Sequence, residues 1–217
     1  MKVTLYGFQY SVYTRIVRIA LLLKKLDFEY VEVDPFTSKE TDSYFQKQPF
    51  KKVPVLNVDG FEIYETSAIT RYIDSIVPDP TLLSKNRETN ARIDQLISIV
   101  DSYAYWPMVR QMFANAVYAP LAGEEVSHEE IITGCQQSDC CLKAIDGLIQ
   151  PSPFLFGKEL TLADIHLAPM VDYFQMSTEG HNILKNHQSV YNWWQQIRLQ
   201  SFMKRTQPDL SMLTNAD

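Results

Sequence analysis

The secondary-structure pattern of this chain changes abruptly at residues 77–80, and this change constrains the fold more than any other feature. Before it, β-favouring runs alternate with runs of helical periodicity. They predict, in order, a strand at 3–6, a helix at 12–23, a strand at 28–33, a connecting helix at 38–45, strands at 53–58 and 61–64, and a helix at 69–76. After it, strand signals nearly vanish and helices are predicted at 93–100, about 126–149, 162–177 and 188–199, with a kink at Pro107.

This order predicts an α/β domain followed by an all-α domain. The first strands are joined by a helix and suit a parallel pair, whereas Asp59-Gly60 is a hairpin turn signal and predicts an antiparallel pair. A thioredoxin-like sheet contains both a parallel pair and an antiparallel pair of strands. We therefore expect a thioredoxin-like domain at 1–76, a linker at 77–86 that begins with Val77-Pro78-Asp79-Pro80, and a helical-bundle domain at 87–217.

Composition excludes several classes of protein. The net charge of −6 argues against a nucleic-acid binder, because a phosphate backbone favours a basic face. No apolar run approaches the ~20 residues of a membrane helix, and the N-terminus carries no basic leader, so a cytoplasmic protein is expected. The three cysteines cluster at 135–141, and the four histidines are scattered, so neither a disulfide framework nor a metal site is predicted.

The strongest local motif combines Lys52-Val53-Pro54 with Glu65-Thr66. A proline that opens a strand tolerates a cis bond, and a cis Val53–Pro54 bond would turn the N–H and C=O of Val53 toward an extended peptide. Ten residues on, a helix N-terminus can hold a carboxylate, Thr66 can add a hydroxyl donor and Glu65 can bind an amino group. A peptide with a free carboxylate and a free amine fits all three, although a plain hairpin followed by a capped helix is the alternative.

Four segments resemble those of the cytosolic glutathione S-transferases. They are Gln48-Pro49-Phe50-Lys51-Lys52-Val53-Pro54, Glu65-Thr66-Ser67-Ala68-Ile69, Leu160-Thr161-Leu162-Ala163-Asp164-Ile165 and Val190-Tyr191-Asn192-Trp193-Trp194. The third also predicts a capping box, in which Thr161 and Asp164 cap one another. The resemblance implies the two-domain transferase fold, glutathione as cosubstrate, no metal, a homodimer and a role in detoxification.

The resemblance further implies a serine-type, bacterial-style member similar to the phi, theta and zeta classes. Ser11, after the first strand, matches the serine that hydrogen-bonds the glutathione sulfur. Tyr6 and Tyr10 are alternatives, and a chain with no sulfur activator is a third. The cysteine-type classes are excluded because no cysteine lies in the first domain.

Glutathione contacts carried over from the family are Lys39, Lys52, Val53, Pro54, Glu65 and Thr66. Lys39 and Lys52 are candidates for the glycine carboxylate, although Glu40 departs from the lysine that phi-like members often carry. Each lysine is equally well explained as a solvated surface charge.

The second substrate is expected to be a small apolar electrophile bound against the helical domain. Tyr105, Met108 and Met112 follow helical spacing and can line one wall of its pocket, with Tyr10 on the other side. Ordinary core or a dimer interface is the alternative for this stripe. The same thiolate also serves glutathione-dependent isomerisation, peroxide reduction or dehalogenation, and the fold is reused in non-catalytic binding modules.

Overall fold

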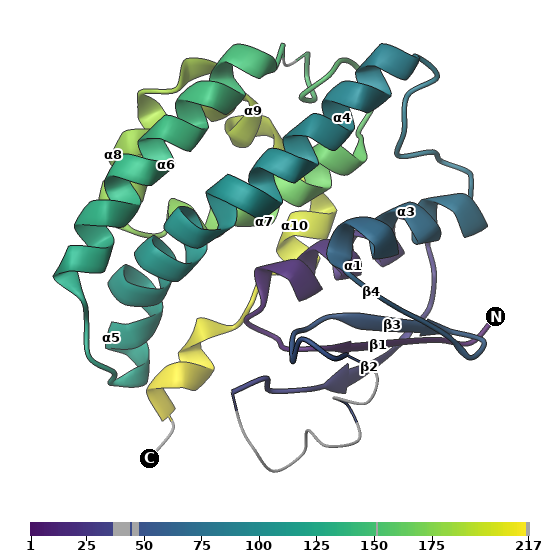
Figure 1. Ribbon diagram of the computed structural model, residues 1–217, viewed down its shortest axis with the longest axis horizontal. Coiled ribbons are helices and arrows are strands. Elements are labelled where there is room, and N and C mark those ends of the chain that lie inside the picture. Colours follow the sequence, from purple (N-terminus) through teal and green to yellow (C-terminus); the bar gives the residue numbers. More distant parts are fainter. Residues whose placement is uncertain (37–43, 45–47, 151, 216–217) are drawn as a thin grey trace. The chain divides into compact units, whose positions relative to one another are not determined.

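The computed structural model describes residues 1–36, 44, 48–150 and 152–215 and divides the chain into two compact units, Met1–Thr81 and Leu82–Asp217 (Figure 1). Each unit is described by itself below. The helix expected at 38–45 lies almost wholly outside the described residues. No helix within the described ranges combines the length and apolar character that crossing a bilayer requires.

Unit 1 is built on a four-stranded sheet in the order β2-β1-β3-β4. The strands are β1 Val3–Gly7, β2 Glu29–Glu32, β3 Val55–Val58 and β4 Phe61–Tyr64. β1 pairs in parallel with β2 and antiparallel with β3, which forms a hairpin with β4. This mixed sheet confirms the predicted thioredoxin-like arrangement.

The two faces of this sheet carry different side chains. Helices α1 Val12–Leu23 and α3 Thr66–Ile76 pack together on one face, where Leu5 and Leu56 are fully buried beneath them (Figure 1). The other face carries an aromatic and aliphatic cluster around Tyr44. Because side chains alternate along a strand, neighbouring residues of β1 serve opposite faces, and Leu5 and Tyr6 divide in this way.

A buried ion pair fixes the end of unit 1. The side chain of Lys24, at the C-terminus of α1, is fully buried, and its Nζ lies 2.5 Å from Oδ1 of Asp74 on α3. The same ammonium group donates to the carbonyls of Val77 and Pro80. Lys24 therefore ties α1 to the segment that leads out of the unit.

We expect Lys24→Met to lower the free energy of unfolding of unit 1 by about 3–5 kcal/mol, because it leaves the Asp74 carboxylate buried without its counter-ion. Lys24→Met combined with Asp74→Leu should cost less than the sum of the two single changes. Lys2→Met is the matched control, since Lys2 pairs with Glu29 at 3.9 Å on an exposed surface. Urea unfolding followed by circular dichroism measures these differences, and additive single changes would contradict a coupled pair.

Unit 2 is all helical in its described part. A long helical stretch runs through α4 Arg87–Ile99, two π-helical segments, Val100–Ala104 and Trp106–Tyr118, and α5 Ala119–Ala122. It is followed by α6 His128–Leu148, α7 Leu162–Phe174, α8 Thr178–Lys185, α9 Gln188–Ile197, α10 Ser201–Arg205 and a 3₁₀ helix at Leu210–Asn215. Pro107 lies inside this continuous helical stretch, at the start of the second π-helical segment, where it removes one backbone hydrogen-bond donor.

Helix α7 forms the centre of unit 2, and all of its residues are buried. The capping box expected at its start is present. The Asp164 carboxylate accepts hydrogen bonds from the backbone N–H and the hydroxyl of Thr161, both at 2.8 Å. It also accepts from Leu155 N–H and Trp193 Nε1, both at 2.9 Å. Asp164 therefore joins α7, the loop before it and α9.

Candidate functional site

Three loop segments meet at one edge of the unit 1 sheet. In the antiparallel pairs, Tyr6 of β1 lies opposite Val55 of β3, and Val55 lies opposite Tyr64 of β4. The C-terminal ends of β1 and β4 therefore lie beside the N-terminal end of β3. The topology brings together residues 8–11, residues 52–54 and residues 65–67, which contain most of the site residues predicted from the sequence.

The middle segment presents peptide backbone. The Val53–Pro54 bond is cis, as the sequence analysis anticipated. Among the described residues, the N–H and C=O of Val53 have no hydrogen-bond partner, whereas Lys52 N–H donates to Gln48 Oε1 at 3.1 Å and Lys52 C=O accepts from the Tyr44 hydroxyl at 2.7 Å. Pro54 is buried and Val53 half-buried, so a donor and an acceptor of Val53 remain for an added extended chain.

The third segment is a helix N-terminus with a strained residue before it. Glu65 is exposed and has φ 68° and ψ 114°, a region that residues other than glycine rarely adopt. Its C=O accepts the first helical hydrogen bond, from Ile69 N–H at 2.8 Å. The preceding N–H groups, those of residues 66–68, have no partner inside the helix. Strain of this kind gathers at ligand sites, and these N–H groups favour an anion.

Ser11 lies at the N-cap of α1 and is half-buried. Its Oγ accepts a hydrogen bond from the backbone N–H of Thr14 at 3.2 Å, so the hydroxyl hydrogen remains available as a donor. Its backbone N–H donates to Phe8 C=O at 2.9 Å, which closes the turn between β1 and α1. The Ser11 hydroxyl therefore lies at the positive end of the α1 dipole and can donate one hydrogen bond.

A close contact between Gly7 and Thr14, missed by the sequence analysis, holds this turn. A Cβ on Gly7 would lie 2.3 Å from Cγ2 of Thr14, so no other residue fits without movement. Thr14 is buried, and its Oγ1 accepts from Phe8 N–H at 3.3 Å. Gln9 N–H donates to Glu32 Oε1 at 3.0 Å and ties the same turn to the end of β2. The glycine after the first strand was the available sequence signal.

The two tyrosines considered as alternatives to Ser11 lie in different surroundings. Tyr6 packs in the cluster on the sheet face opposite the helices, with its ring centroid 6.1 Å from that of Tyr44. Tyr10 forms an edge contact with Phe8 at 5.3 Å, and Phe8 forms another with Phe36 at 6.0 Å. Tyr10, Phe8 and Phe36 thus make a continuous aromatic row beside Ser11.

The remaining predicted site residues differ in how deeply the structure buries them. Lys39 lies outside the described residues. Met108 and Met112 have no exposed surface, and Met112 Sδ lies 3.5 Å from Cys135 Sγ, so both serve the core of unit 2, the alternative that the sequence left open. Tyr105 is only half-buried, and burial raises the pKa of its hydroxyl while Arg110 acts in the opposite direction.

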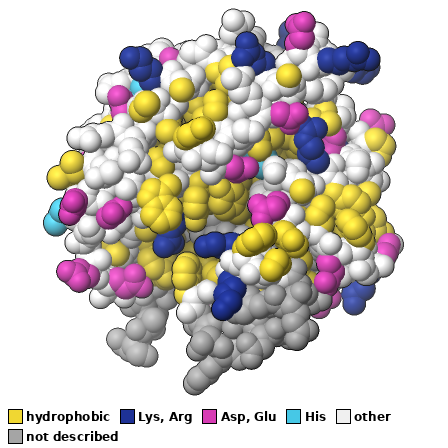
Figure 2. Space-filling view, in the orientation of Figure 1, with side chains coloured by type: hydrophobic (Ala, Val, Ile, Leu, Met, Phe, Trp, Pro, Cys, Tyr) yellow, Lys and Arg dark blue, Asp and Glu magenta, His cyan; other side chains and the backbone are white. Residues whose placement is uncertain are grey.

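The possible metal ligands among the described residues are dispersed. No three His, Cys, Asp or Glu side chains there come together as a metal site. On the face drawn in Figure 2, basic side chains are interspersed with acidic ones and form no continuous basic surface. Burial raises the pKa of the Cys141 thiol to about 11, so this cysteine has little thiolate character at neutral pH.

A mixed four-stranded sheet with a cis proline at its edge, followed by a separate helical unit, defines a thioredoxin-like protein with a helical second domain. Models of the glutathione S-transferase N-terminal domain and C-terminal domain match residues 5–81 and 139–195. Glutathione S-transferase 1 of Dianthus caryophyllus is 30% identical over 206 residues, which are 91% of this chain and 90% of that protein. The chain belongs to the glutathione S-transferase family.

Two further comparisons agree with membership of this family. Glutathione S-transferase F10 of Arabidopsis thaliana is 28% identical over 216 residues, which cover 98% of this chain and 99% of that protein. The solved structure of a glutathione S-transferase-I bound with lactoylglutathione is 18% identical, has a TM-score of 0.81 and covers 98% of this chain and all of its own. The latter likeness extends the agreement to the fold.

Proposed function

We propose that this chain is a serine-type glutathione transferase that activates the glutathione thiol through Ser11. Glutathione lies along the edge of the unit 1 sheet, and its sulfur accepts a hydrogen bond from the Ser11 hydroxyl. This bond favours loss of the thiol proton to solvent, and the thiolate that remains attacks a small apolar electrophile. The observation that carries this proposal is the geometry of Ser11. Its oxygen already accepts from Thr14 N–H, so its hydrogen is available to a further acceptor.

A hydrogen bond from Ser11 and the N-terminus of α1 together supply enough free energy to stabilise the glutathione thiolate. A free thiol has a pKa near 8.5, and lowering it by ~2 units takes about 2.7 kcal/mol in favour of the thiolate. One hydrogen bond to a charged group contributes about 1.5–3 kcal/mol. The N-terminus of α1 adds ~0.3–1 kcal/mol for a nearby negative charge. Ser11 therefore needs no general base to hold the sulfur as a thiolate.

The other groups of glutathione have matching partners in unit 1. The cysteinyl backbone pairs with the N–H and C=O of Val53 as an added strand. The γ-glutamyl carboxylate accepts from the first N–H groups of α3, with Thr66 as an additional donor, and the Glu65 carboxylate binds the amine. Lys39 and Lys52 remain the candidates for the glycine carboxylate. A structural relative holds a glutathione derivative, lactoylglutathione, which supports this class of ligand.

The electrophile is proposed to be aromatic. The row formed by Phe8, Tyr10 and Phe36 lies within unit 1 beside the proposed sulfur position, and two of its members are half-buried. Edge and offset contacts between rings stabilise an aromatic ligand by about 0.5–1.5 kcal/mol beyond burial. A cytoplasmic homodimer is proposed on the family resemblance alone.

We expect Glu65→Gln to weaken glutathione binding about 10- to 100-fold, because a charged hydrogen-bond partner of the amine is replaced by a neutral one. Isothermal titration calorimetry with glutathione measures this effect. Glu62→Gln is the matched control, because Glu62 is an exposed glutamate of β4 whose side chain accepts from Asn57 at 3.2 Å.

The same titration tests the function as a whole. Wild-type protein should bind glutathione and conjugate it to chlorodinitrobenzene. Wild-type protein that binds no glutathione would contradict the proposed function. Wild-type binding that is equally strong in Glu65→Gln would contradict the assignment of Glu65 to the amine. Binding without any conjugation would move the protein to the non-catalytic binding modules of this fold.

A further inference from the structure

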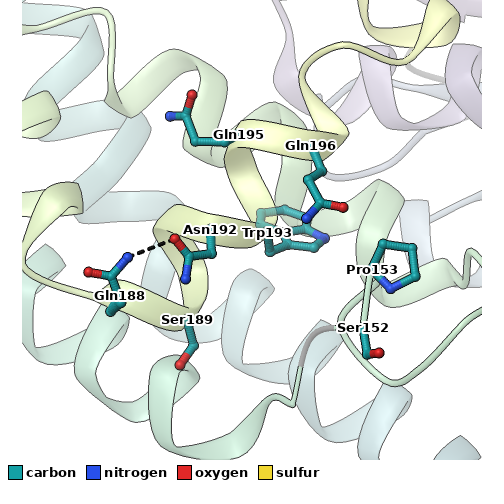
Figure 3. Close-up of a pocket in the computed structure, with 8 residues that line it drawn as sticks. All are labelled: Ser152, Pro153, Gln188, Ser189, Asn192, Trp193, Gln195 and Gln196. Carbon is teal, nitrogen blue, oxygen red and sulfur yellow. Dashed lines mark hydrogen bonds between the residues drawn. The ribbon is translucent and has the colours of Figure 1, made fainter.

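A cavity lies within unit 2, and none of its lining residues is among those assigned to glutathione. It has a volume of about 490 Å³ and lies between α9 and the loop at residues 152–153 (Figure 3). Its lining residues are Ser152, Pro153, Gln188, Ser189, Asn192, Trp193, Gln195 and Gln196. Small-molecule sites commonly fall in this range of volumes.

The lining is rich in hydrogen-bonding groups and carries no charged side chain. Four carboxamides and two hydroxyls surround the cavity, and each carboxamide offers two donor hydrogens and an acceptor oxygen. Gln188 Nε2 donates to Asn192 Oδ1 at 2.7 Å, and this bond orients both amides (Figure 3). The Gln188 oxygen and the Asn192 nitrogen keep their capacity for further hydrogen bonds.

The N-terminus of α9 does not make this cavity an anion site. A helix N-terminus ordinarily attracts anions through its unpaired N–H groups. Here Asp146 Oδ1 accepts from the N–H groups of Ser189 and Val190, at 2.8 and 3.0 Å. The carboxylate of α6 therefore occupies these donors and adds negative charge beside them. A phosphate or carboxylate ligand is disfavoured, whereas an uncharged ligand meets no such repulsion.

Both walls of the cavity are fixed to one buried group. Asp164 Oδ1 accepts from Leu155 N–H in the loop and from Trp193 Nε1 on α9, both at 2.9 Å. The loop is closed further by Ser152 N–H, which donates to Phe154 C=O at 3.0 Å. Walls that are held in place before binding reduce the entropy lost when a ligand is ordered.

We propose that this cavity binds a neutral polyhydroxylated small molecule, namely an uncharged sugar. Each sugar hydroxyl is at once a donor and an acceptor, as the carboxamides of Gln188, Asn192 and Gln196 are. The exposed ring of Pro153 supplies apolar surface for the C–H groups of a sugar ring. This site does not depend on glutathione binding or on Ser11.

The test is a titration of the full-length protein with glucose. The ¹⁵N-resolved NMR signals of its side-chain amides report the binding. Glucose should shift the amide signals of Gln188, Asn192 and Gln196 in a saturable way. Glucose 6-phosphate, the matched anion, should bind at least several-fold more weakly. Asn192→Leu should weaken glucose binding about tenfold, the effect of roughly one hydrogen bond. Gln137→Leu, which changes an exposed amide of α6, should leave it unchanged.

Three results would overturn the proposal. They are glucose shifts that do not saturate, equal glucose binding by wild type and Asn192→Leu, and tighter binding of glucose 6-phosphate than of glucose. The amide signals of α9 in Asn192→Leu without ligand show whether the variant has kept its fold. If it has not, Asn192→Asp tests the same position, since it keeps the acceptors and removes both donors.

Discussion

Replacing Ser11 with alanine should raise the pKa of the bound glutathione thiol by about 1–2 units, because the one hydroxyl donor to the sulfur is lost. Below neutral pH the thiolate fraction, and with it turnover, should fall about 10- to 100-fold. The thiolate's ultraviolet absorbance against pH measures the pKa, and conjugation kinetics measure turnover. Glutathione affinity should change far less, because Val53, Glu65 and α3 hold the rest of the molecule.

Ser11 is also the N-cap of α1, so a control must separate the cap from the hydroxyl donor. Ser11→Ala loses about 1 kcal/mol of capping energy, whereas glycine at an N-cap loses only a few tenths. Ser11→Gly should therefore reproduce the pKa shift with little loss of stability. Ser75→Ala removes an exposed hydroxyl that donates to Tyr72 C=O and should change neither quantity. An unaltered thiol pKa in Ser11→Ala and Ser11→Gly would shift the role to Tyr6 or Tyr10, or to no side chain.

Replacing Asp164 with alanine should lower the free energy of unfolding of unit 2 by more than about 4 kcal/mol. The carboxylate is fully buried and accepts four hydrogen bonds, from Leu155, Trp193 and twice from Thr161. Alanine leaves all of these donors without a partner, and each buried unsatisfied donor costs about 1–3 kcal/mol. Tryptophan fluorescence during urea unfolding reports on unit 2, because all three tryptophans lie there.

Asp164→Asn is the conservative variant and should cost less than alanine. Its oxygen can still accept from Leu155 and Trp193, while its NH₂ group faces the Thr161 N–H. Asp94→Ala, at an exposed site on α4, should change stability by less than about 0.5 kcal/mol. Equal stability of wild type and Asp164→Ala would contradict the role of Asp164 as the group that joins α7 to α9.

The same carboxyl gives unit 2 a defined pH dependence. Burial raises the pKa of Asp164 above its ordinary 3.8, although its four hydrogen bonds act in the opposite direction. The folded state therefore binds this proton more tightly than the unfolded state does. The proton-linked part of the contribution of Asp164 to stability is fully present below pH 3.8, the ordinary pKa, and is lost as pH rises through the folded pKa. The advantage of wild type over Asp164→Asn should accordingly shrink from acidic to neutral pH.

Local sequence signals were enough to predict a structural element wherever that element is determined by residues close together in the chain. The strands at 3–6 and 61–64, the hairpin at Asp59-Gly60 and the capping box at Thr161 all appear as predicted, because turn chemistry and strand alternation act over a few residues. The predicted helix at 162–177 was wrong at its end. It stops at Phe174, and a separate helix, α8, begins at Thr178.

That error arises because helical periodicity does not show where this helix ends. Ser177 caps α8 by accepting from Gly180 N–H at 3.0 Å, and a Cβ on Gly180 would lie 2.0 Å from Phe174 C=O. The glycine is therefore required by a close backbone approach that periodicity does not reveal. The stripe of Met108 and Met112 has the same origin, since helical spacing fits a ligand wall and a core equally well and only burial in unit 2 separates them.

The sequence by itself determined the two-part organisation and the candidates Val53 and Glu65, because these depend on spacing and on short motifs. Ser11 followed from the resemblance to serine-type transferases. Only the tertiary structure decided how these residues combine. The antiparallel pairing of β1, β3 and β4 brings segments 50 residues apart to one edge of the sheet. The bond of Trp193 to Asp164 likewise joins residues whose proximity no local pattern encodes. Distant contacts form only when the whole core is packed, and the chain order alone does not specify their geometry.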